Sequence, residues 1–113
     1  MRRGELYWID WSPGRGSEQT GRRPGLIVQR DAANRNENYP NTVVVAVSTK
    51  GRPIPFHIEL LPTPETGLTE RSWAKCEQVM TISKERVKER IGAINAETRE
   101  SVGVALKKVL DLE

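Results

Sequence analysis

Short stretches of apolar and β-branched residues, separated by polar segments, run through the first two thirds of the chain and predict β-strands. Residues 5–11 (ELYWIDW) are aromatic-rich and carry apolar side chains on both faces of an extended backbone. Residues 42–48 (TVVVAVS) form a continuous run that is typical of a buried strand. Residues 54–60 (IPFHIEL) alternate between apolar and polar positions, and further strands are expected at 24–29 and 72–82.

Helical signals gather in the last third of the chain. Ser83 can cap a short helix over residues 84–91 that stops at Gly92. Asn95 can cap a final helix that runs to about Leu110. Its apolar stripe would consist of Val102, Ala105, Leu106 and Val109.

About five closely spaced strands followed by one or two helices predict a mainly β chain with a C-terminal helix, in one domain over residues 1–113. Residues 12–22 and 31–41 are rich in Gly or Asn and are expected to be loops. An SH3-like barrel is the natural compact solution, and an open α+β sandwich is the alternative. The two-sided apolarity of residues 6–11 also predicts a homodimer, whose two-fold interface would cover such a surface.

The distribution of charge adds a candidate partner. The net charge is only +3, but the first 35 residues carry seven Arg, no Lys and four acidic residues. The planar fork of Arg matches phosphate oxygens, so this excess indicates a phosphate-bearing partner, with an ordinary solvated surface as the alternative. One cysteine excludes an internal disulfide, and neither a signal peptide nor a membrane-spanning run is recognised. We therefore expect a cytoplasmic protein.

The most specific local feature is an arginine at the end of a Gly-rich segment. Residues 12–22 lead into Arg23 and Pro24 at the start of an expected strand. Pro24 restricts Arg23 to an extended backbone, which helps to fix where the guanidinium group begins. An Arg held in this way can stabilise the charge of a crowded phosphate; the alternative is a surface Arg in a turn.

Three ordered blocks make the chain resemble the MazF/PemK family of toxin endoribonucleases. They are RGELYWID followed by GSEQTGRRPGLIVQ and an Asn-Arg pair at 34–35, then TVVVAVS, then CEQVMTIS. The resemblance implies the SH3-like barrel of the PemK/MazF/CcdB-like toxins, a homodimer, and the toxin role in a type II toxin–antitoxin system. It also implies a metal-independent, sequence-selective mRNA interferase. Such an enzyme cleaves single-stranded RNA to 2′,3′-cyclic phosphate and 5′-hydroxyl ends.

The same resemblance implies the catalytic residues. Arg23 matches the family's catalytic Arg, and Ser48 matches the position of its catalytic Thr. Thr49 is adjacent to Ser48, so the choice between these two hydroxyls stays open. A guanidinium is a poor base at neutral pH, and a single histidine excludes a two-His mechanism. The general base is therefore open between Glu18, His57 and bulk water.

Further residues are expected to contact RNA or support the site: Trp11, Glu18, Gln19, Arg22, Thr49, His57, Glu77 and Gln78. Trp11 is expected to stack on a base, whereas Trp8 is expected in the core or at a dimer interface. Glu18 and Gln19 alternatively cap backbone groups of the turn, and His57 is alternatively a structural residue. Glu77 lies where the last strand is expected to kink, either near the site or in a buried ion pair with an Arg.

The sequence contains no motif that would indicate a bound cofactor or metal ion. No nucleotide-binding motif is present, and one His, one Cys and scattered carboxylates give no zinc-ligand spacing. Cys76 is expected in the core. The expected partners are single-stranded RNA and an antitoxin whose acidic C-terminal segment occupies the RNA groove. Two alternatives remain, a non-enzymatic toxin of the same fold that binds a protein such as DNA gyrase, and a non-catalytic nucleic-acid-binding barrel.

Overall fold

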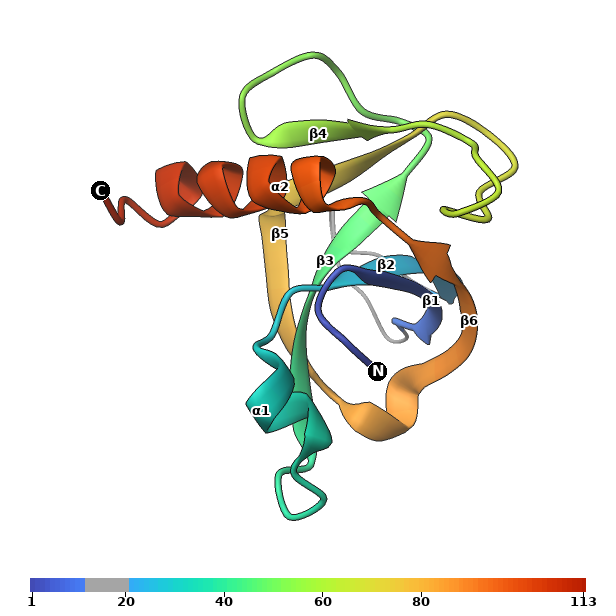
Figure 1. The fold of residues 1–113 in the computed structure, drawn as a ribbon, viewed down its shortest axis with the longest axis vertical. Helices are drawn as coiled ribbons and strands as arrows, with labels where there is room; N and C mark the ends of the chain where they lie inside the picture. Colours follow the sequence, from blue (N-terminus) through green and yellow to red (C-terminus); the bar gives the residue numbers. More distant parts are fainter. Residues whose placement is uncertain (12–20) are drawn as a thin grey trace.

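One bent antiparallel sheet with a C-terminal helix forms the computed structural model, which describes residues 1–11 and 21–113 (Figure 1). The six strands are β1 (Glu5–Asp10), β2 (Arg22–Ile27), β3 (Asn41–Ser48), β4 (His57–Leu60), β5 (Ser72–Ser83) and β6 (Val87–Ala93). The helices are α1 (Asp31–Arg35), the 3-10 turn η1 (Lys84–Arg86) and α2 (Ala96–Val109). The mainly β chain with a C-terminal helix is therefore confirmed. None of the described helices is long and apolar enough to cross a membrane.

The strands are ordered β4-β5-β3-β2-β1-β6, and all the pairings are antiparallel. The segment between β4 and β5 reaches across to β6, where the backbone N–H of Ala93 donates to the carbonyl of Glu65. Gly92 is required at this contact, because a Cβ there would lie 2.3 Å from the carbonyl oxygen of Thr66. The bent sheet is thus brought toward a barrel by a loop that spans its two edge strands.

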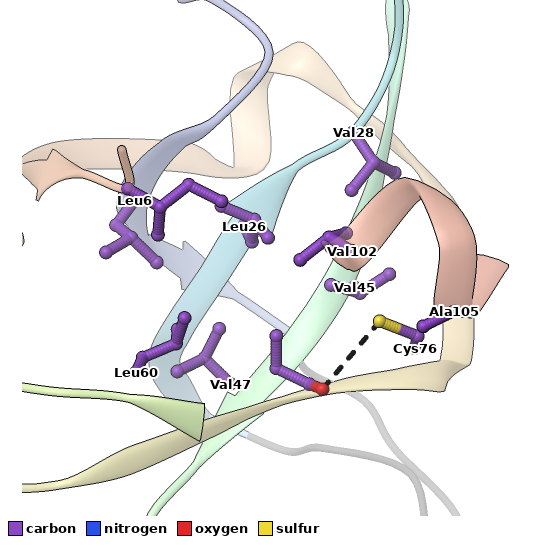
Figure 2. Close-up of a cluster of buried hydrophobic side chains, with 11 residues drawn as sticks. Leu6, Leu26, Val28, Val45, Val47, Leu60, Cys76, Val102 and Ala105 are labelled. Carbon is purple, nitrogen blue, oxygen red and sulfur yellow. Dashed lines mark hydrogen bonds between the residues drawn. The ribbon is translucent and has the colours of Figure 1, made fainter. Parts of the chain in front are cut away.

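Apolar side chains cover both faces of the central strands, which explains the unbroken apolar run in β3. Val45 and Val47 belong to one core, packed beneath α2 together with Leu6 and Leu26 (Figure 2). Val44 and Ala46 belong to a second core on the opposite face, whose other members are Ile9, Trp11, Ile27 and Ile82. Leu6, Ile9 and Trp11 are therefore buried within one chain, and Trp8 is the large apolar side chain of β1 that stays exposed.

The expected helix over residues 84–91 is wrong. Ser83 does cap a turn, since its hydroxyl accepts the N–H of Glu85 at 3.2 Å, but that turn ends at Arg86. The following residues form β6, which pairs with β1 at the edge of the sheet. Its exposed Lys88, Glu89 and Arg90 resemble a solvated helical surface, and charged side chains are also common on edge strands.

A second correction concerns residues 31–41, which contain the short helix α1 rather than only a loop. Buried hydrogen bonds hold it in place. The side-chain oxygen of Asn34 accepts from Gln29 at 3.0 Å and from Thr42 at 2.8 Å, and its amide donates to the Gln29 carbonyl at 2.9 Å. These contacts are tertiary, so local sequence propensity does not reveal the helix.

The final helix forms as expected. Asn95 accepts the N–H of Thr98 at 2.8 Å, and α2 packs against β4 and β5. Val102 and Ala105 are buried, and Leu106 and Val109 pack partly against the same core. Cys76 is fully buried there, which confirms its expected core position (Figure 2). Burial raises the pKa of its thiol to about 11, so it stays protonated at neutral pH.

Candidate active site

A pocket of about 490 Å³ opens where the start of β2, the end of β3 and residues 67–70 meet. Several sequence-predicted site residues lie in its wall, namely Arg22, Arg23, Ser48 and Thr49. The described lining residues also include residues that were not predicted as site residues, namely Trp8, Lys50, Thr69, Glu70 and Lys75. The pocket therefore brings the arginine segment to the end of β3, as the sequence analysis expected.

Arg23 and Ser48 lie on neighbouring strands. The ladder of β2 with β3 begins where Gly25 pairs with Ala46, and Arg23 and Ser48 lie two residues beyond that pair, each still within its strand. Both residues line the same pocket, so one phosphate group bound there can contact both side chains.

Arg22 has a different environment. It pairs with Asp10 on β1, whereas Arg23 pairs with Ile9, so consecutive side chains leave opposite faces of β2. The guanidinium of Arg22 makes an ion pair with Glu89 at 3.1 Å on the exposed edge strand β6. Of the other arginines in the first third of the chain, Arg3 donates to the backbone carbonyl of Val28. The arginines in the first third of the chain therefore do not all contribute to one phosphate-binding surface.

The expected stacking role of Trp11 is wrong. Its side chain is only 3 % exposed and packs in the second core. Its indole N–H donates to the backbone carbonyl of Arg23 at 3.1 Å, so Trp11 supports the site through the backbone. Trp8, expected in the core or at a dimer interface, is not in the core: it is 39 % exposed and lines the pocket. The alternation of side chains along an extended strand correctly places the two indoles on opposite faces. It does not show which of these faces is buried by the rest of the chain.

The hydroxyl of Ser48 is held by the turn that follows β3. Its Oγ accepts the backbone N–H of Lys50 at 3.0 Å, and the side chain is only partly buried. A hydroxyl that accepts one hydrogen bond keeps its own proton to donate, so Ser48 can donate to a phosphate oxygen. Thr49 also lines the pocket and is exposed.

His57, Glu77 and Gln78 are not among the described residues that line the pocket. His57 is buried; its Nε2 lies 2.9 Å from Glu77, and its Nδ1 accepts the N–H of Arg52 at 3.3 Å. Since Nδ1 accepts, Nε2 carries the proton and donates to the carboxylate. These contacts favour the structural alternative for His57. The expected buried ion pair of Glu77 with an Arg is wrong, because its partner is His57 and its side chain is 36 % exposed.

β5 does bend near Glu77, as expected. Its register with β3 shifts between Val45, which pairs with Val79, and Ala46, which pairs with Lys75. Glu18 and Gln19 lie outside the described residues. Among the residues that are described, no three His, Cys, Asp or Glu side chains gather in an arrangement that could hold a metal ion.

The residues missed by sequence reasoning come from two places. Thr69 and Glu70 belong to the segment between β4 and β5, which gave no local signal and reaches the pocket only through the closure of the sheet. Lys75 does carry a signal, since it is a charged residue within an otherwise apolar stretch of β5. Charged residues at such positions are rarely buried without a reason.

Comparison with known proteins agrees with this geometry. Residues 2–110 match the family described as PemK-like, MazF-like toxin of type II toxin–antitoxin systems. The chain is 37% identical to "Endoribonuclease MazF9" of Mycobacterium tuberculosis, over 99% of this chain and 98% of that protein. It is 38% identical to "Endoribonuclease MazF" of Staphylococcus saprophyticus, over 99% of this chain and 92% of that protein.

Solved structures show the same fold. A MazF from Deinococcus radiodurans superposes with a TM-score of 0.81 at 23% identity, covering 99% of this chain and 97% of that one. A mycobacterial endoribonuclease solved with its cognate antitoxin superposes with a TM-score of 0.79 at 26% identity, covering 100% of this chain and 97% of that one. The chain therefore belongs to the PemK-like, MazF-like family of toxins from type II toxin–antitoxin systems.

Proposed function

We propose that this toxin is a metal-independent endoribonuclease that cleaves single-stranded mRNA at selected sequences in the cytoplasm. The observation that carries the proposal is that Arg23, at the start of β2, and Ser48, at the end of β3, line one pocket. Two relatives that are 37% and 38% identical in sequence are named endoribonucleases, which supports the same activity. A DNA gyrase inhibitor or a passive RNA-binding barrel would not need this pair of groups.

The proposed reaction joins the ribose 2′-oxygen to the adjacent phosphorus and releases the 5′-oxygen, leaving 2′,3′-cyclic phosphate and 5′-hydroxyl ends. The phosphorane that forms carries more negative charge on its nonbridging oxygens than the substrate does. The guanidinium of Arg23 stabilises that added charge, and the hydroxyl of Ser48 donates a hydrogen bond to the same oxygens. Both groups therefore bind the transition state more strongly than the ground state.

The reaction also requires a group that accepts the proton of the 2′-hydroxyl, and the departing 5′-oxygen takes up a proton from solvent water to become the 5′-hydroxyl. Both ring nitrogens of His57 are already engaged, with Glu77 and with the backbone of Arg52, so we assign His57 a structural role. The carboxylate of Glu70 is the acidic group among the described lining residues, and an ionised carboxylate can accept this proton. Glu18 stays a second candidate for the base.

The direct test of this function is cleavage of a long RNA in the presence of EDTA, with the new ends mapped chemically. We expect discrete fragments whose 5′ pieces end in cyclic phosphate and whose 3′ pieces begin with 5′-hydroxyl. Loss of cleavage with EDTA and recovery with magnesium would contradict the proposal. A plain 3′-hydroxyl with a 5′-phosphate would show a different reaction.

We further propose that a cognate antitoxin inhibits the enzyme by laying an acidic, extended C-terminal segment into the pocket. Support comes from the mycobacterial relative solved with its cognate antitoxin and from the lining cations Arg22, Arg23 and Lys50. The antitoxin should compete with an RNA analogue, and its binding should weaken as salt rises. An antitoxin that inhibits without competing would contradict this mode of inhibition.

We also propose a homodimer, on the strength of the family resemblance. Light scattering at micromolar concentration should give twice the mass of one chain. A scattering mass of one chain over that range would contradict the dimer.

A further inference from the structure

Lys75 is a cation in the pocket that the proposed mechanism does not use. It lies on β5, lines the pocket and is partly buried. Among the described residues it has neither a hydrogen-bond partner nor an ion-pair partner. A cation in the wall of a pocket attracts an anion that binds there.

The strand register places Lys75 beside the proposed catalytic hydroxyl. Lys75 pairs with Ala46, and Trp73 pairs with Ser48, so Lys75 and Ser48 are diagonal neighbours on one face of the β3–β5 pair. Diagonal neighbours lie about 7–8 Å apart, which a long side chain can span. Ser48 stands two residues further along β3 than Ala46, a step of about 6.8 Å in a strand. That step is comparable to the separation of successive phosphates in single-stranded RNA.

The charges around Lys75 leave it available to an anion. The carboxylate two residues along β5 belongs to Glu77, and His57 holds it at 2.9 Å. The described lining residues include the cations Arg23, Lys50 and Lys75, together with Arg22, whose guanidinium pairs with Glu89, and the acidic side chain among them is that of Glu70. An excess of cations over acids in the lining of a hollow surface is the arrangement expected for a phosphate backbone.

We propose that Lys75 binds the RNA phosphate next to the scissile one, while Arg23 and Ser48 hold the scissile phosphate itself. The inference rests on the proposed ribonuclease function and adds a substrate-binding residue to it. An ammonium group on a flexible stem suits a contact that holds the strand in register, whereas a planar guanidinium suits the reacting phosphate. Lys75 should therefore contribute to affinity rather than to the rate of the bound complex.

The test uses a short RNA that contains the mapped cleavage site, with a single 2′-deoxy nucleotide there so that it binds without being cut. Lys75→Met keeps the apolar stem and removes the charge. We expect it to weaken binding on the order of tenfold. We also expect the slope of log affinity against log salt to fall by about 0.7, the value for one lost phosphate contact on a single strand. Lys75→Arg should restore the slope.

Lys107→Met, on the exposed surface of α2, is the matched control and should change neither quantity. With the cleavable RNA at saturation, Lys75→Met should cut at close to the wild-type single-turnover rate. An unchanged affinity and salt slope would overturn the proposal, and so would a lost rate at unchanged affinity, which would place Lys75 at the reacting phosphate. Failure of the wild-type chain to cut RNA at all would instead overturn the proposed function, and this outcome is seen when the cleavage site is mapped, before any Lys75 variant is measured.

Discussion

The indole N–H of Trp11 donates a hydrogen bond to the backbone carbonyl of Arg23 at 3.1 Å. This contact ties the start of β2 to the end of β1, where Trp11 packs in the second core. Gly25 permits the close approach, because a Cβ there would lie 3.0 Å from the Trp11 ring and 2.3 Å from Ile9. The backbone that carries the proposed catalytic guanidinium is thus fixed from a buried side chain.

Removing only this hydrogen bond should impair catalysis. Trp11→Phe keeps an aromatic ring in the core and deletes the donor, so it should destabilise the fold by about 1–2 kcal/mol. Because small displacements of a catalytic group are costly, the single-turnover cleavage rate should fall roughly tenfold. Trp8→Phe is the control, since the Trp8 indole makes no hydrogen bond to any residue that the structure describes. Equal rates for the two variants would show that the Trp11 contact does not position Arg23.

Trp8 is the indole placed to stack on a base. It is 39 % exposed and lines the pocket, so Trp8→Ala should weaken RNA binding by roughly 5- to 100-fold, the range for loss of one stacked base. Trp8→Phe should retain most of the affinity. Binding is measured with the uncleavable 2′-deoxy RNA. Unchanged affinity in Trp8→Ala would exclude stacking on this residue.

Ser48 and Thr49 can be separated by substitution. Because Ser48 ends β3 within the pocket that Arg23 also lines, and its oxygen already accepts from Lys50, we expect Ser48→Ala to lose more cleavage rate than Thr49→Ala. Loss of one transition-state hydrogen-bond donor costs roughly 10²- to 10³-fold in rate. Ser48→Thr keeps the hydroxyl and should stay nearly active. The reverse order of the two alanine variants would assign the catalytic hydroxyl to Thr49.

Glu5 should make the fold sensitive to acid. Burial raises the pKa of its carboxyl, but hydrogen bonds from Arg90, the backbone of Arg2 and the hydroxyl of Tyr7 outweigh that effect and hold the pKa below its usual value of 4.5. A depressed pKa in the folded state stabilises the protein above the unfolded value and loses that contribution as pH falls through the folded one.

The matching experiment compares Glu5→Gln with the wild type by chemical denaturation across pH. At pH 7 the variant should be less stable by roughly 0.5–1 kcal/mol, since the Glu5–Arg90 pair is partly solvated. The difference should shrink as pH falls below about 4.5, the usual value for this carboxyl. A difference that is independent of pH would mean that packing, rather than charge, explains the effect.

The sequence predicts the elements that depend on neighbouring residues, and it misses those that depend on contacts between distant segments of the chain. The strand β3 and the cap of α2 follow from local patterns, an apolar run and Asn95, and both were predicted. The strand β6 was not, because its charged residues resemble a helical surface until β1 is known to pair with it. Likewise, Trp11 was expected to be open to RNA and is buried, and Trp8 is not in the core, since alternation does not show which face the rest of the chain covers.

In the candidate site, too, residues in local motifs were predicted and residues brought in by long-range pairing were missed. Arg23 and Ser48 were found because they stand in recognisable blocks, and the structure places both in one pocket. Lys75 and Glu70 were missed because they reach the pocket only through the pairing of β5 with β3 and the closure of the sheet by the segment before β5. Residues brought together by long-range pairing need the fold before their proximity is visible.

The most direct test of the account is the single-turnover cleavage rate of Arg23→Ala beside that of Arg22→Ala, each with binding of the uncleaved RNA followed separately. Arg23→Ala should lose at least about 10²-fold in rate while keeping much of its affinity, because other cations still meet phosphates. Arg22→Ala, which loses an exposed pairing with Glu89, should lose far less. A dead Arg22→Ala beside an active Arg23→Ala, or full activity in both, would contradict the assignment of Arg23 as the catalytic residue.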